Sequence, residues 1–127
     1  MITGIGIDVV HVTRIEHWLS VPGLVDRFFH PDEIVASHER GPAAPLSLAA
    51  RFAAKEAFGK AIGTGLSGIR LKDIQVINNH NGKPDMLLHG TALERFRRTG
   101  DTILHLSMTH ERENAIAMVV IETRDRP

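Results

Sequence analysis

The segment RFAAKEAFGKAIGTG, residues 51–65, contains the strongest helical pattern of the chain and ends in two glycines. Its apolar spacing, extended toward the amino terminus, predicts a long helix from about Leu46 to Ile62. Gly63 suits the left-handed position that commonly follows a helix. We therefore expect this helix to lie at the centre of the fold, with the other elements packed on it.

The charged residues of this helix fall on two faces. At about 100° per residue, Ser47, Arg51 and Lys55 share one side, which we predict to be exposed to solvent. Glu56 and Lys60 lie roughly 100° or more away from that side. The stripe that they share is made of Ala49, Phe52 and Ala53.

Two explanations account for Glu56 and Lys60 on a stripe of small and apolar residues. One is a structural ion pair between positions i and i+4, which is worth about 0.2–0.5 kcal/mol in an isolated helix. The other is a functional carboxylate with a lysine one turn away. The local pattern supports both equally.

Composition limits the classes of protein that the chain can belong to. Its 127 residues, 43% hydrophobic and 24% charged, are typical of one soluble globular domain spanning residues 1–127. Lys plus Arg equals Asp plus Glu at 15 each, so no global field recruits nucleic acid. The absence of cysteine excludes disulfides and thiolate chemistry. No signal peptide or membrane-spanning segment is recognisable, which predicts a cytoplasmic protein.

The amino-terminal segment, residues 2–10, alternates as a strand does, with Gly4, Gly6 and Asp8 on one face. Glycines within a strand often mark the close approach of a ligand or of another backbone. We expect them to clear space beside Asp8. Asp8 is either the amino-terminal cap of the next helix or a functional carboxylate.

The remaining pattern predicts three further helices, four strands and two loops. We expect helices over 11–20, from Pro31 onward, and over 91–98, the last with a capping box formed by Thr91 and Glu94. Residues 41–45 and the glycine-rich residues 64–68 form loops. Strands are predicted over 72–78 and 84–89, joined as a hairpin at Asn81-Gly82, and over 102–110 and 115–121.

Together these elements predict an α+β fold with a mostly antiparallel sheet of about five strands on the long helix. The segment 115–121 is apolar at every position and is expected to be a central strand covered on both faces. The 102–110 strand carries a polar row that ends in Ser107, Thr109 and His110. This row could bind a ligand or cap a turn. The tail from Thr123 to the end is predicted to be frayed.

Asp8 and Glu56 together favour a particular chemistry. Two carboxylates from separate elements, completed by water and substrate phosphates, are the usual ligands of Mg²⁺. Lys60 would add a positive charge for phosphate oxygens. The chain lacks the G-x-S-x-G motif of acyl hydrolases and the H-E-x-x-H motif of zinc hydrolases. The residues therefore favour phosphoryl chemistry.

Three motifs resemble one known family. GIGIDVVHVTRIE (4–16), RFAAKEAFGKAIGTG (51–65) and HLSMTHERENAIAMVVIE (105–122) are similar, in order and spacing, to the holo-acyl-carrier-protein synthases. These are the short, trimeric branch of the 4′-phosphopantetheinyl transferases. The resemblance spans nearly the whole chain.

The resemblance implies an activity and a set of site residues. The phosphopantetheine arm of coenzyme A would be transferred to a serine of apo acyl carrier protein, and adenosine 3′,5′-bisphosphate would leave. Asp8 and Glu56 would bind Mg²⁺, and Lys60 would stabilise the leaving phosphate. The proton of the serine would go to Glu56 or to a water of the metal site. Coenzyme A would be contacted by Lys55, Lys60, Gly63, Gly65, Ser107, Thr109 and His110.

The resemblance also implies two kinds of protein contact. Acyl carrier proteins are acidic, so Arg14 and Arg27, with His11 and His17 nearby, would supply the basic patch that a neutral chain needs. Trp18 would add an apolar contact where the family has a smaller aliphatic residue or methionine. A homotrimer with sites between subunits, serving fatty acid biosynthesis, is the implied assembly and role.

Two other functions use the same residues. A non-catalytic protein that binds coenzyme A or a nucleotide would keep every activity after Asp8→Ala. A Mg²⁺-dependent phosphohydrolase would use the same acids without a carrier protein.

Overall fold

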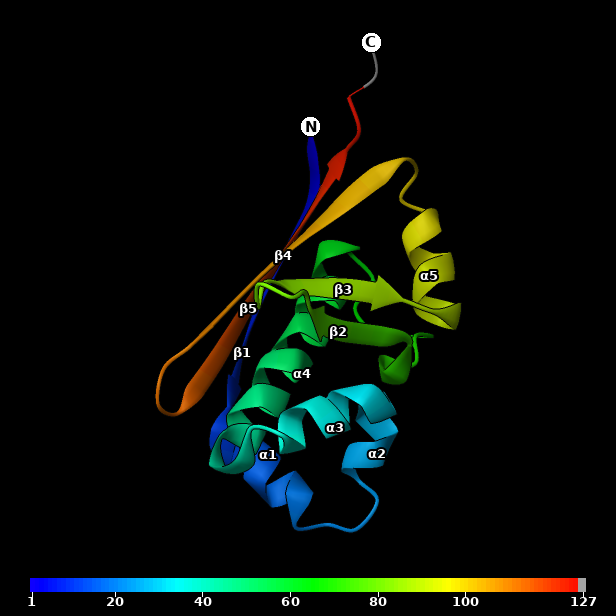
Figure 1. The fold of residues 1–127 in the computed structure, drawn as a ribbon. Helices are drawn as coiled ribbons and strands as arrows, with labels where there is room; N and C mark the ends of the chain where they lie inside the picture. Colours follow the sequence, from blue (N-terminus) through cyan, green and yellow to red (C-terminus); the bar gives the residue numbers. More distant parts are fainter. Residues whose placement is uncertain (126–127) are drawn as a thin grey trace.

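The computed structural model describes residues 1–125 and shows an α+β fold in which every strand pairing is antiparallel (Figure 1). The helices are α1 (Val12–Leu19), α2 (Val25–Phe28), α3 (Pro31–His38), α4 (Ala44–Ala61) and α5 (Gly90–Arg97). The strands are β1 (Ile2–His11), β2 (Ile74–Asn78), β3 (Pro84–Leu88), β4 (Thr102–His110) and β5 (Asn114–Thr123). None of the described helices is both long enough and apolar enough to cross a membrane.

The predicted strands all form, and they are divided between two sheets. The larger sheet has the order β1-β5-β4, and the β2–β3 hairpin forms the smaller one. The predicted central position of the 115–121 segment is confirmed, because β5 pairs with β1 on one side and β4 on the other. Thr123 ends β5, and the last two residues of the tail predicted to fray lie outside the described ones.

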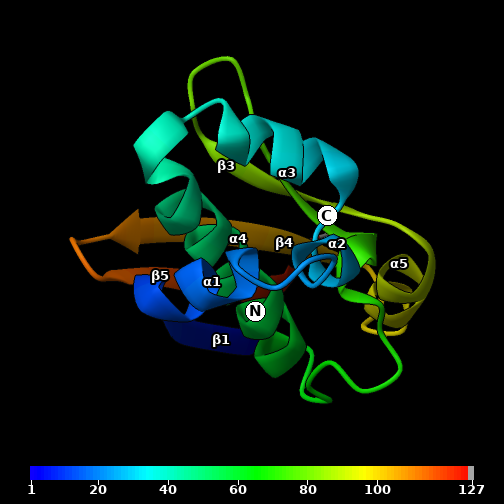
Figure 2. The same ribbon diagram turned by 90° about the horizontal axis from the view of Figure 1, so that it is seen from below.

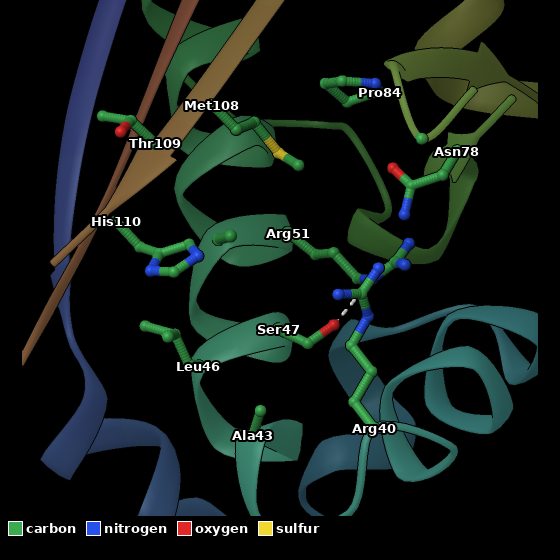
Figure 3. Close-up of a pocket in the computed structure, with 12 residues that line it drawn as sticks. Arg40, Ala43, Leu46, Ser47, Arg51, Asn78, Pro84, Met108, Thr109 and His110 are labelled. Atoms are coloured by element: carbon green, nitrogen blue, oxygen red, sulfur yellow. Dashed lines mark hydrogen bonds between the residues drawn. The ribbon is translucent and has the colours of Figure 1, made fainter. Parts of the chain in front are cut away.

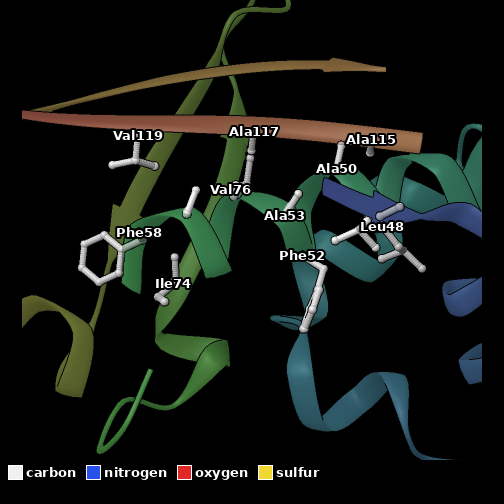
Figure 4. Close-up of a cluster of buried hydrophobic side chains, with 14 of the residues drawn as sticks. Leu48, Ala50, Phe52, Ala53, Phe58, Ile74, Val76, Ala115, Ala117 and Val119 are labelled. Carbon is white, nitrogen blue, oxygen red and sulfur yellow. The ribbon is translucent and has the colours of Figure 1, made fainter. Parts of the chain in front are cut away.

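Helix α4 is the centre of the molecule, as the sequence predicts. It crosses one face of the larger sheet and contacts α1, α3 and β2 as well (Figures 1 and 2). Small residues on α4 allow this close packing on several sides, and the alanines Ala49, Ala53 and Ala57 are fully buried. Larger side chains fill the layers on either side of the helix (Figure 4). They include Leu48, Phe58, Ile74, Val76 and Val119.

The glycines of β1 serve the packing of this helix. A methyl group on Gly6 would lie 1.9 Å from the carbonyl oxygen of Ala57, and one on Gly4 would lie 2.0 Å from that of Ala61. These distances are far inside van der Waals contact, so only glycine lets the strand approach α4 this closely. The expected empty space beside Asp8 is therefore occupied by the helix backbone, and the close approach is between two backbones.

The other face of the larger sheet is apolar and exposed. Ile5, Ile7 and Val9 of β1 are 50–61% exposed, and Met118 of β5 is 41% exposed. Strand β5 is therefore covered on only one face by its own chain. The sequence predicted that this strand is covered on both faces, and in the single chain its outer face is exposed instead.

Two local predictions are wrong. Arg51 and Lys55, expected on a solvated face, are 3% and 0% exposed because α3 and β2 cover that side of α4. The capping box at Thr91 and Glu94 does not form. The hydroxyl of Thr91 instead donates to the Asp73 carboxylate at 2.6 Å and accepts from the backbone N–H of Arg70 at 2.9 Å.

Candidate active site

Asp8, Glu56 and Lys60 come together where β1 crosses the carboxyl-terminal half of α4. The glycine-mediated contact brings the end of β1 against this part of the helix. The Lys60 ammonium donates to Asp8 Oδ1 at 3.0 Å and to the Ile7 carbonyl at 2.9 Å. The Lys60 side chain is 53% exposed and that of Asp8 19%. The site thus opens to solvent, and one of the three ammonium donors stays available to a ligand.

Glu56 lies close to this pair, and its charge is only partly balanced. Burial, followed by the negative charge of Asp8, raises the pKa of Glu56, while Arg14 and Lys60 act in the opposite direction. Among residues 1–125 the carboxylate of Glu56 has no hydrogen-bond or ion-pair partner. Of the two explanations for Glu56 and Lys60, the structural ion pair between them does not form, because Lys60 pairs with Asp8.

The donor set fits a hard divalent cation. Two carboxylates from separate elements repel each other here, and one of them lacks a partner, so a cation between them would relieve both conditions. No group of three His, Cys, Asp or Glu residues converges in the described part of the chain. A cation held by Asp8 and Glu56 would therefore take its other oxygens from water and from substrate, as Mg²⁺ commonly does.

A second polar site lies on the other side of α4. A pocket of about 240 Å³ opens between this helix, the β2–β3 hairpin and the end of β4 (Figure 3). Arg40, Arg51 and His110 line it, together with Ser47 and Asn78. Three groups that can carry positive charge therefore meet in one concave surface. Sequence reasoning missed Arg40, Arg51 and Asn78, because their meeting depends on how α3 and the hairpin pack on α4.

Arg51 is held in this pocket by hydrogen bonds. Its guanidinium donates to the Val76 carbonyl and, from Nε at 3.5 Å, to the Ser47 hydroxyl. Burial lowers the pKa of Arg51, an effect that Glu33 opposes and Arg40 reinforces. Arginine nevertheless stays charged in proteins.

Lys55 occupies a different environment from the one predicted for a residue that contacts coenzyme A. Its ammonium donates to Glu33 Oε1 at 2.7 Å, to the Leu71 carbonyl at 2.9 Å and to the Ile74 carbonyl. All three donors are used, and the side chain is fully buried. Burial is the main cause of its lowered pKa, and Glu33 acts against it. In this structure Lys55 joins helices α3 and α4 to the β2 strand.

The other predicted ligand residues are distributed around the molecule. Thr109 and His110 reach the pocket, and Figure 3 shows the His110 ring pointing toward α4. Ser107 is exposed and pairs with Met118 on the outer face of the larger sheet. Gly63 and Gly65 have φ angles of 82° and 64° in the exposed loop after α4. One chain therefore does not gather all of them around Asp8.

Helix α1 places its basic residue beside the carboxylates. Arg14 is close enough to lower the pKa of Glu56, and its guanidinium lies 5.0 Å from the centre of the Trp18 ring. Arg27 on α2 is exposed. Of the residues predicted to form the basic patch, Arg14 therefore lies near Glu56.

Comparison with known proteins identifies the family. The sequence model of one protein family, the 4′-phosphopantetheinyl transferase superfamily, matches residues 4–119 of this chain. A holo-[acyl-carrier-protein] synthase of Treponema denticola is 54% identical over 122 residues, which cover 96% of this chain and 99% of that protein. The chain belongs to the 4′-phosphopantetheinyl transferases, among the holo-[acyl-carrier-protein] synthases. It is therefore an enzyme of this type.

Solved structures of such transferases share the fold. The holo-[acyl-carrier-protein] synthase of Neisseria meningitidis superimposes with a TM-score of 0.85 at 35% identity, covering 97% of this chain and 100% of that one. The Bacillus anthracis synthase, solved in complex with coenzyme A (3′,5′-ADP), superimposes with a TM-score of 0.81 at 36% identity. The match covers 98% of this chain and 99% of that one. These similarities confirm the predicted fold class.

Proposed function

We propose that this transferase moves the 4′-phosphopantetheine group of coenzyme A to a serine hydroxyl of apo acyl carrier protein, with Mg²⁺, and releases adenosine 3′,5′-bisphosphate. The observation that carries the proposal is the convergence of Asp8, Glu56 and Lys60 at an open site. The Bacillus anthracis and Helicobacter pylori synthases, both solved with coenzyme A, support the choice of donor.

In the proposed reaction the serine oxygen attacks the β-phosphorus of coenzyme A, and the bond from that phosphorus to the bridging oxygen breaks. The bridging oxygen leaves with the adenosine bisphosphate. The serine proton passes to Glu56 or to a water at the metal site. Glu56 suits the first role because its carboxylate accepts no hydrogen bond from the described residues, so an oxygen is available to take the proton.

Lys60 and the metal site would stabilise the charge that builds up on phosphate oxygens. Lys60 keeps one free donor while it holds Asp8 in place, so it can bind the leaving phosphate without releasing the carboxylate. Asp8 and Glu56 would hold Mg²⁺, which when bound supplies positive charge to the pyrophosphate oxygens. The carboxylates thereby share one cation instead of repelling each other.

The pocket lined by Arg40, Arg51 and His110 suits the phosphorylated nucleotide end of coenzyme A, because its cationic groups match phosphate oxygens. Arg51 and Glu56 are five residues apart on one helix, which places them about 140° apart around its axis. An assembly in which the pocket of one copy faces Glu56 of another would let a single donor molecule contact both.

The exposed apolar face of the larger sheet offers a surface for such an assembly. Ile5, Ile7, Val9 and Met118 together form a contiguous patch of the kind that marks a protein interface. We infer a homotrimer whose sites lie between subunits. Within this trimer, Gly63, Gly65 and Ser107 are still predicted to contact coenzyme A. Lys55 is not included, because its side chain is buried and all three of its ammonium donors are used.

The acidic partner would dock on α1 and α2, where Arg14 and Arg27 are exposed. A role in fatty acid biosynthesis and a place in the cytoplasm belong to the same proposal. Transfer to a carrier protein distinguishes this function from the two alternatives. A phosphohydrolase would cleave coenzyme A without a carrier, and a binding protein would leave it intact.

The test is to incubate the protein with apo acyl carrier protein, coenzyme A and Mg²⁺ and to weigh the carrier by mass spectrometry. We expect the carrier to gain the mass of the phosphopantetheine group, and a carrier whose acceptor serine is replaced by alanine to gain none. Cleavage of coenzyme A with no gain by any carrier would contradict the proposal in favour of the phosphohydrolase.

A further inference from the structure

Arg14 of α1 is held against two aromatic rings. Its guanidinium carbon lies 5.0 Å from the centre of the Trp18 ring and 5.2 Å from that of Phe52. The two rings are themselves in edge contact, with centres 4.8 Å apart and planes at 87°. Arg14 and Trp18 are four residues apart on one helix, so their side chains lie on the same face.

Trp18 is fixed by this packing. Besides Phe52, its ring contacts Phe28 of α2, with centres 5.1 Å apart. The Trp18 side chain is half-buried, and Phe52 beneath it is only 4% exposed. The rings therefore form a packed cluster that joins α1, α2 and α4 and holds the indole beside Arg14.

Arg14 itself is exposed and has no acidic partner. Among residues 1–125, no carboxylate lies within ion-pair distance of its guanidinium. Its charge acts on Glu56 only through space. An exposed cation that is ordered by aromatic rings, and not by a carboxylate, keeps its hydrogen-bond donors available to an external anion.

Arg27 provides the contrast within the same patch. It is also exposed and basic, but no aromatic ring in the described part of the chain supports its guanidinium. It must lose more side-chain freedom when it binds an acidic partner than Arg14 does.

We propose that Trp18 is a positioning residue for Arg14: with Phe52 it holds the guanidinium ready for a carboxylate of the acidic carrier protein. This inference rests on the proposed function for the identity of the partner. It replaces the expectation that Trp18 itself supplies an apolar contact. Trp18 then acts on the carrier through Arg14.

The first test is binding, which does not depend on catalysis. The dissociation constant of a fluorescently labelled apo carrier is measured for the wild type, Trp18→Leu, Arg14→Ala and the double variant. We expect Trp18→Leu to raise it about two- to fivefold, the range of an exposed cation–π contact. In the Arg14→Ala background the same substitution should have no further effect. Trp18→Phe, which keeps a ring, should recover part of the loss.

Arg27 supplies the matched control. Because Trp18 does not support Arg27, Trp18→Leu should raise the dissociation constant by the same factor in the Arg27→Ala background as in the wild type. If Trp18→Leu weakens binding equally with and without Arg14, Trp18 contacts the carrier directly and the proposal is wrong.

The second test observes the free enzyme by NMR. Ring currents of Trp18 and Phe52 should displace the side-chain signals of Arg14, and Trp18→Leu should return them toward the values of a mobile arginine. Unchanged Arg14 signals in this variant would overturn the proposal. A wild type that binds the carrier without modifying it would contradict the proposed function alone, because both tests would still give their result.

Discussion

Lys55 and Lys60 lie on the same helix, five residues apart, and have opposite environments. Lys55 is fully buried and donates to Glu33 and to two backbone carbonyls. Lys60 is half-exposed, pairs with Asp8 and keeps one donor unused. The comparison shows that residue type and motif position do not distinguish a structural lysine from a ligand-binding one. The number of unused donors and access to solvent do.

The acids near these two lysines, Glu33 near Lys55 and Glu56 near Lys60, differ in the same way. Glu33 accepts from Lys55 and from the backbone N–H groups of His30 and Val76, so its charge is fully compensated. Glu56 accepts no hydrogen bond among the described residues and is repelled by Asp8. In the first environment the loss of a partner would leave a buried charge uncompensated, whereas the second stores a repulsion that a cation can relieve.

The largest expected effect is that of Lys55→Met on stability. Removal of the ammonium leaves Glu33 buried without its charge partner, and breaking such a pair typically costs about 3–5 kcal/mol. Lys60→Met should change the free energy of unfolding by no more than about 1 kcal/mol, since its pair with Asp8 is exposed. Urea unfolding followed by circular dichroism measures both. Equal losses in the two variants would contradict the distinction between the lysines.

The next largest effect concerns activity at the two carboxylates of the candidate active site, Asp8 and Glu56. Asp8→Asn and Glu56→Gln should each lower the rate of carrier modification by at least about 100-fold, because each removes a metal ligand and Glu56→Gln also removes a candidate base. Neither should lower the midpoint of urea unfolding. Asp85→Asn, an exposed acid on β3, serves as the control and should keep the wild-type rate. Full turnover by Glu56→Gln would show that the site is assigned incorrectly.

Gly6→Ala tests how the site is assembled. The added methyl group would overlap the Ala57 carbonyl and push β1 away from α4, at a cost of about 1–3 kcal/mol. Because this contact sets the position of Asp8 relative to Lys60, we expect carrier modification to fall as well. The measurement is the rate under conditions where the variant is fully folded. A destabilised variant with the wild-type rate would show that β1 does not position the site.

The smallest expected effect is a pH-dependent gain of stability in Glu56→Gln. The pKa of Glu56 is raised in the folded protein, so its contribution to stability is complete below the ordinary glutamate pKa of about 4.3. That contribution is lost as the pH rises through the raised value. At neutral pH without divalent cations, the variant should be more stable than the wild type by less than about 1 kcal/mol.

The control for the stability gain of Glu56→Gln is that the gain is lost at low pH. The difference between variant and wild type should vanish about one pH unit below the ordinary glutamate pKa of about 4.3, where Glu56 is protonated in both the folded and the unfolded state. Urea unfolding over a pH series measures it. A variant less stable than the wild type at neutral pH would mean that Glu56 is stabilised by a partner.

Much of the fold was predictable because its signals are local. The alternation of residues 2–10 and 102–110, the Asn81-Gly82 turn and the apolar run in β5 each depend on neighbouring residues in sequence. The core helix was predictable for the same reason. The side of α4 that carries Arg51 and Lys55 was mispredicted, because a charged face looks solvated until the groups that compensate it are known.

The sequence by itself determined the elements, the family resemblance and the choice of Asp8, Glu56 and Lys60, since glycine spacing and charge on an apolar stripe can be recognised locally. Only the tertiary structure decided that the glycines of β1 admit a helix backbone, that Lys55 is saturated and that Lys60 pairs with Asp8. The physical reason is that burial and hydrogen-bond partners depend on atoms distant in the chain. A residue's chemistry is set by those atoms as much as by its own identity.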